Sequence, residues 1–131
     1  MRTYKFRAWD SVKKVFPFIG FHILGECCAF DLIRQYELEE LNNLVISQFT
    51  GLVDKSGKEI YEGDILLING YDCLSETYTL TKGVVCFQHG CFITKDLGKY
   101  KIEQNAGTLI DDERHLEIIG NIFENEKLLK L

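Results

Sequence analysis

The stretch LVISQFTGLVDKSGKEIYEGDILLIN, residues 44–69, alternates short β-prone runs with glycine-containing turns. Its outer runs, LVISQF and DILLIN, are rich in the branched and aromatic residues that favour strands. The turns are DKSG at 54–57 and EGD at 62–64, and Gly57 can supply the positive φ that closes a hairpin. The continuous apolar run in DILLIN predicts a strand buried on both faces. This stretch therefore predicts β-structure rather than helix.

A period of two also governs the N-terminal region. In TYKFRAW, the side chains of Lys5, Arg7 and Trp9 point to one side of an expected strand. VFPFIGFHIL at 15–24 reads as a second strand or pair of strands. Pro17 favours a position at the edge of a sheet because proline cannot donate a ladder hydrogen bond.

The C-terminal region repeats the same pattern of runs and turns. GVVCF and CFIT, within 83–94, are joined through Gln-His-Gly and predict a hairpin. HLEIIGNIFEN at 115–125 is a further strand signal, interrupted by Gly120, and a short helix at most follows it. Residues 25–43 and 95–113 have no clear pattern, although a short helix or a solvated connection fits the first of them.

Length and composition indicate a folded, strand-rich protein. The chain has 131 residues, of which 46% are hydrophobic, and no Pro- or Ser-rich linker. We predict a mainly β fold in which antiparallel strands form a small barrel-like core with one or two short helices. Residues 1–131 are expected to fold as a single domain, with an N-terminal β layer (1–49) and a C-terminal barrel-like half (50–131).

The charge and the cysteines limit which cellular compartment and which classes of binding partner are expected. Fifteen basic against twenty acidic residues give a net charge of −5, which disfavours non-specific binding to duplex nucleic acid. The five cysteines are an odd number without the spacing of a secreted scaffold, so reduced thiols in a cytoplasm are expected. No apolar run follows the basic N-terminus, and the apolar stretch 15–24 is about half of the roughly 20 residues that a spanning helix needs. We therefore expect a cytoplasmic protein without membrane insertion.

Candidate phosphate and metal sites are weak. Between Gly51 and Gly57 the loop has five residues rather than four, and Glu59 stands where a phosphate loop requires Ser or Thr. A zinc site could use Cys86, His89 and Cys91, with Cys73 as a fourth ligand, but this spacing is not that of a known zinc knuckle. A hairpin turn and cysteines that fill a core explain both segments, so no cofactor and no metal are expected.

No catalytic set is evident in the sequence. The three histidines, at 22, 89 and 115, are far apart, and no hydrolase motif occurs. Acidic residues gather around the turns at 54–64 and again at 111–113, where they could attract a cation or a basic partner. Acidic turn residues are usually structural, and we expect Asp64 to hold backbone amides. A metal-dependent hydrolase or nuclease stays as one alternative.

The N-terminal strand provides the best argument for nucleic-acid binding. If Lys5, Arg7 and Trp9 share a solvent-facing surface, cations alternate with an aromatic plane, as a platform for single-stranded nucleic acid requires. The competing interpretation is that Trp9 packs beneath a neighbouring loop.

Three segments together resemble the YopX family of small phage and prophage proteins. They are KFRAWD at 5–10, QFTGLVDKSGKEIYEGDIL at 48–66 and EIIGNIFENEKLL at 117–129. The resemblance implies a mainly β fold, a phage or prophage origin and work in the host cytoplasm, and it transfers no catalytic residues. The positions that match as structural turn formers are Gly51, Asp54, Gly57, Gly63, Asp64 and Gly120.

Taken together, these features predict a non-enzymatic accessory protein that binds a macromolecule. Exposed strand edges and an acidic C-terminal half favour another protein, from the host or the phage, as the partner. Unpaired edges also favour self-association into a homo-oligomer. The alternatives are single-stranded nucleic-acid binding through the N-terminal strand and the metal-dependent hydrolase.

Overall fold

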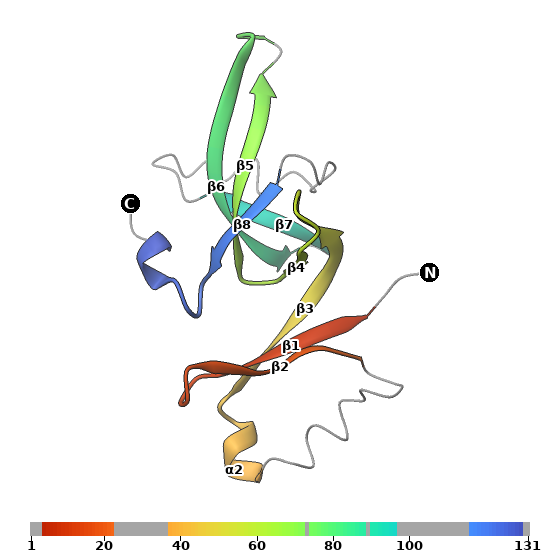
Figure 1. Cartoon of the computed structure of the whole chain (residues 1–131), viewed down its shortest axis with the longest axis vertical. Helices are drawn as coiled ribbons and strands as arrows, with labels where there is room; N and C mark the ends of the chain where they lie inside the picture. The colour runs from red at the N-terminus through yellow and green to blue at the C-terminus, as the bar shows by residue number, and fades with distance from the viewer. Residues whose placement is uncertain (1–3, 23–36, 73, 89, 97–115, 130–131) are drawn as a thin grey trace.

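The computed structural model describes residues 4–22, 37–72, 74–88, 90–96 and 116–129 (Figure 1). In these residues the dominant element is the antiparallel strand, arranged in two four-stranded sheets. The prediction of a mainly β fold is confirmed. The described strands form two open sheets, each with two edge strands, and not a closed barrel.

The first sheet is built from the N-terminal half of the chain. Its strands are β1 (Lys5–Asp10), β2 (Val15–His22), β3 (Leu44–Val53) and β4 (Glu59–Tyr61), in the order β2-β1-β3-β4. Pro17 lies on β2, an edge strand, as predicted from its missing donor. The short helix α2 (Leu38–Leu41) leads into β3.

The second sheet is built from the C-terminal half. Its strands are β5 (Asp64–Asp72), β6 (Thr77–Gln88), β7 (Cys91–Asp96) and β8 (Leu116–Asn121), in the order β7-β6-β5-β8. A single turn of 3-10 helix, η3 (Glu126–Leu129), follows β8. The hairpin predicted over 83–94 is the β6–β7 pair, in which Cys86 faces Ile93.

The core lies where β4 of the first sheet meets the second sheet. Its buried members are Ile60, Leu66, Val85 and Leu116. On β5, both Ile65 and Leu66 are fully buried although their side chains point to opposite faces, which confirms the prediction of two-sided burial for DILLIN. The apolar run in the sequence therefore marks the centre of the second sheet.

The turn at Gly63 joins the two sheets. Its N–H donates to the carbonyl of Val85 (2.8 Å), and its own carbonyl accepts the N–H of Ile122 (2.8 Å). Gly63 has φ +86°, and a Cβ there would lie 3.1 Å from the ring of Phe123. A residue with a side chain would be strained in this conformation and would press on that ring.

Candidate functional site

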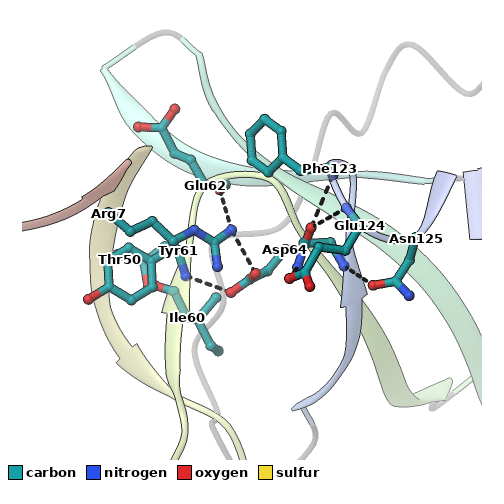
Figure 2. Close-up of polar contacts among 10 residues, drawn as sticks. Arg7, Thr50, Ile60, Tyr61, Glu62, Asp64, Phe123, Glu124 and Asn125 are labelled. Atoms are coloured by element: carbon teal, nitrogen blue, oxygen red, sulfur yellow. Dashed lines mark hydrogen bonds and ion pairs between the residues drawn. The ribbon is translucent and has the colours of Figure 1, made fainter. Parts of the chain in front are cut away.

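A buried ion pair between Arg7 of β1 and Asp64 of β5 lies at the junction of the two sheets (Figure 2). The Nη2 atom of Arg7 is 2.9 Å from Oδ1 of Asp64, and it donates a hydrogen bond to the carbonyl of Glu62 (3.0 Å). Oδ2 of Asp64 accepts the N–H of Tyr61 at 2.8 Å. The two charged side chains are only 9% and 3% exposed, so the pair ties the sheets together and offers little charge to solvent.

Two aromatic rings contact the guanidinium of Arg7. The Cζ atom of Arg7 lies 4.8 Å from the ring centre of Phe16 and 5.0 Å from that of Tyr61. Such cation–π contacts are attractive, and more so when water is excluded. The Nε atom of Arg7 is buried without a hydrogen-bond partner among the described residues. The rings and the carboxylate therefore hold this cation as a structural element.

Burial shifts the pKa values of Asp64 and Tyr61 at the junction. It raises the pKa of Asp64, while the Arg7 charge and the Tyr61 amide oppose that rise. Burial, together with the nearby Glu59 carboxylate, raises the pKa of Tyr61 to about 12. The Tyr61 hydroxyl donates to Oε2 of Glu59 at 3.4 Å. At neutral pH this hydroxyl is a hydrogen-bond donor and does not act as a base.

A pocket of about 700 Å³ opens beside the ion pair. Residues of β1, β2, β4 and β8 line it, and the charged members of the lining are Lys5, Arg7, Lys58, Glu59, Asp64 and Glu124. Lys5 and Glu59 are paired at 3.0 Å, and Arg7 is paired with Asp64. With three cations and three carboxylates, the lining favours neither an anion nor a cation by its charge.

Asp54 fastens the β3–β4 turn to the second sheet. Its Oδ1 atom accepts hydrogen bonds from the Ser56 amide (2.9 Å), the Ser56 hydroxyl (2.8 Å) and the Lys58 amide (3.0 Å). Its Oδ2 atom accepts the N–H of Ile118 on β8 (3.2 Å). Burial favours the neutral acid, but these hydrogen bonds outweigh it and lower the pKa of Asp54. The turn thus covers part of the outer edge of β8.

Gly120 leaves room for the C-terminal turn. A Cβ at this position would lie 2.6 Å from Oδ1 of Asn125, an atom that accepts the N–H of Asn121 at 3.1 Å. Oδ1 of Asn121 in turn accepts the amides of Phe123 (3.0 Å) and Glu124 (2.8 Å), the two donors that Figure 2 labels. This turn places Phe123 against the first sheet.

The other turn positions named from the sequence are also at bends of the backbone. Gly51 has φ +88° within β3, where the pairing with β4 is irregular between Phe49 and Val53. Gly57 has φ +86° at the end of the hairpin turn, the conformation expected for the residue that closes it. Both positions are occupied by glycine where other residues would be strained.

The nucleic-acid surface expected on β1 required Lys5, Arg7 and Trp9 to face solvent together, and the structure buries two of these three side chains. Arg7 and Trp9 are 7% and 4% exposed, and Lys5 is paired with Glu59. The ring of Trp9 lies 5.5 Å from that of Phe123, in the turn after β8. Alternation identifies the face that these residues share, but the second sheet and the C-terminal turn cover it. The competing interpretation, with Trp9 beneath a loop, matches the structure.

The proposed zinc ligands can be followed only in part. Cys86 and Cys91 lie on β6 and β7, while Cys73 and His89 lie outside the described residues. The thiol of Cys91 donates to the carbonyl of Gln88 at 3.4 Å, and burial raises the pKa of Cys86. In the described ranges, no group of three His, Cys, Asp or Glu side chains is placed to hold a metal ion. The acidic run 111–113 also lies outside those ranges.

A protruding ribbon is the feature of the second sheet that sequence reasoning missed. β8 pairs with β5 only over 64–68, and β7 pairs with β6 only over 83–88. Among the described strands, residues 69–72 therefore pair only with β6, and residues 77–82 pair only with β5. Figure 1 shows this end of the hairpin projecting beyond the rest of the described chain. We call residues 69–72 and 77–82 the outer ribbon.

Comparison with known protein families identifies the family of this chain. The family model described as YopX protein matches residues 5–130. The chain belongs to the YopX family. The resemblance stated from the sequence is thereby confirmed over nearly the whole chain.

This YopX protein also has a structural neighbour in the crystal structure of protein EF1440 from Enterococcus faecalis. The TM-score is 0.59 at 22% sequence identity, over 99% of this chain and 100% of the other. At this identity the similarity shows a shared fold. No curated protein matches the sequence. Among the helices that the structure describes, none is long and apolar enough to span a bilayer.

Proposed function

We propose that this YopX protein is an accessory protein of a phage or prophage that binds another protein through an exposed strand edge in the host cytoplasm. It works by association and without catalysis. The observation that carries the proposal is the outer ribbon, whose two strands lack further strand neighbours among the described residues. A strand edge presents a row of backbone donors and acceptors that an added strand can pair with.

The edges of β2, β4 and β8 carry features that hinder an added strand. β2 contains Pro17 and a bulge at Gly20, with φ +77°, and β4 has only three residues. The outer edge of β8 is covered where Lys55 donates to the carbonyl of Leu116 (2.9 Å) and Asp54 accepts from Ile118. Proline, bulges, short strands and covering loops are the devices by which proteins block unwanted pairing.

The outer ribbon has fewer such devices. Over 77–82, β6 contains no proline and a single charged residue, Lys82. Leu80 is 65% exposed, an apolar side chain on a strand that no third strand supports among the described residues. An isolated two-stranded ribbon is marginal in water, so an added strand would stabilise it.

Site-specific photo-crosslinking in the host tests the proposal. A benzoylphenylalanine at Leu80 is expected to give a discrete protein adduct. The same probe at Ser56, an exposed turn residue on another part of the chain, is the matched control and is expected to give none. Absence of an adduct at Leu80, or identical adducts at both positions, would exclude the ribbon as the binding edge.

A further inference from the structure

We infer that the outer ribbon pairs with a second copy of this chain, edge to edge along residues 77–82 of β6. This inference rests on the proposed function and names its partner. The segment that carries it is ETYTLTK, residues 76–82. Its two ends have opposite charges, and threonine occupies every second position between them.

Two-fold symmetry makes this segment complementary to itself. When two copies of β6 run antiparallel about an axis at Thr79, Lys82 of one copy lies beside Glu76 of the second copy, the turn residue that precedes its strand, and the reverse contact follows by symmetry. The same register sets Thr77 opposite Thr81 of the second copy. Opposite charges and threonine pairs are favourable when they face each other across antiparallel strands.

Other antiparallel registers lose these contacts. Moving the axis from Thr79 to residue 78 or 80 displaces the pairing by two residues, so that neither Glu76 nor Lys82 has a charged residue opposite. Because the residues between them carry no charge, only the axis at Thr79 satisfies both ends of the segment. The charges therefore select one register.

The structure leaves the required groups accessible. Glu76 and Lys82 are exposed, and Leu80 between them is 65% exposed. Glu76 ends the turn with φ +53°, and β6 extends from Thr77. Pairing with β7 begins at Gly83, opposite Asp96, so 77–82 is the length of β6 that is open to a new strand among the described residues.

Charge-reversal variants, with dimerisation measured by sedimentation velocity, test the inference. The wild-type chain is expected to be a dimer. Glu76→Lys and Lys82→Glu each place like charges opposite each other twice per dimer, and each is expected to raise the dissociation constant about tenfold or more. An equimolar mixture of the two variants restores both attractive contacts, so it should dimerise like the wild type. Circular dichroism of each variant checks that the fold is retained.

Lys127→Glu is the matched control, because it makes the same charge change at an exposed residue of η3. It is expected to dimerise like the wild type. A monomeric wild type, a mixture that stays monomeric, or an equal effect of Lys127→Glu would overturn the inference. The Leu80 crosslink separates the two proposals: an adduct with a different protein keeps the proposed function and rejects the second copy, whereas no adduct rejects both.

Discussion

Replacing Arg7 by methionine tests how the two sheets are held together. Methionine keeps a long apolar side chain at this position. It removes the cation that Asp64 faces at 2.9 Å and the donor to the Glu62 carbonyl. Asp64 would stay buried with the Tyr61 amide as its hydrogen-bond donor. Removing one partner of a buried ion pair costs about 3–5 kcal/mol, because the other charge is left uncompensated.

The cost should depend on pH in a defined direction. Without Arg7, the pKa of Asp64 in the folded protein rises further above its value in the unfolded chain. A carboxyl whose folded pKa is raised loses stability as pH rises from the unfolded pKa, near 4, to the folded pKa. Arg7→Met should therefore be less harmful below pH 4 than at pH 7.

Urea unfolding followed by tryptophan fluorescence measures this effect. Trp9 is the single tryptophan, and it is buried against Phe123 at the same junction. The double variant Arg7→Met, Asp64→Asn removes both charges and keeps an acceptor for the Tyr61 amide, so it should be more stable than Arg7→Met alone.

An exposed ion pair supplies the control for the buried one. Lys13→Met breaks a pair with Glu40 at 3.7 Å, whose side chains are 61% and 44% exposed, and should cost less than about 0.5 kcal/mol. A loss of under about 1 kcal/mol in Arg7→Met, or a double variant no more stable than the single one, would show that the ion pair does not hold the sheets together.

Three further predictions concern the turns and Tyr61. Asp54→Ala should lower the free energy of unfolding at pH 7 by about 2 kcal/mol, since it leaves several amides without an acceptor. Because the folded pKa of Asp54 is lowered, the stability that its carboxylate contributes is present above about pH 4 and is lost as pH falls through the folded pKa. The free energy of unfolding, measured by urea titration, should therefore change less between neutral and acid pH in the variant than in the wild type. Tyr61 should titrate near pH 12 in absorbance at 295 nm, a transition that Tyr61→Phe removes, and its contribution to stability should be lost as pH rises from about 10 to 12. Gly63→Ala should lower the melting temperature more than Gly51→Ala. Both glycines have positive φ, but only at position 63 would the new Cβ meet the Phe123 ring. Equal decreases in melting temperature for the two variants would contradict that contact.

Features that depend on neighbours in the sequence could be predicted. The turns at Gly57 and Gly63, the edge position of Pro17 and the two-sided burial of the DILLIN strand follow from backbone freedom, a missing donor and an apolar run. Each of these signals lies within a few residues of the feature it predicts.

Features that depend on how the sheets pack could not be predicted. Alternation correctly grouped Arg7 with Trp9, but their burial comes from β5 and the turn after β8, far away in the sequence. One available signal was Asp64 at the start of a buried strand, because a buried carboxylate requires a cation or several donors. The outer ribbon was missed because it results from the short pairing of β7 and β8 with their neighbours, which no local pattern encodes.

Amide hydrogen exchange over residues 77–82, compared at low and high protein concentration, examines the binding edge itself. If a second chain pairs along β6, these amides should exchange more slowly as concentration rises, while those of the turn at 54–58 should not change. Exchange over 77–82 that does not respond to concentration while the mass of the particle doubles would place the interface elsewhere and contradict our account.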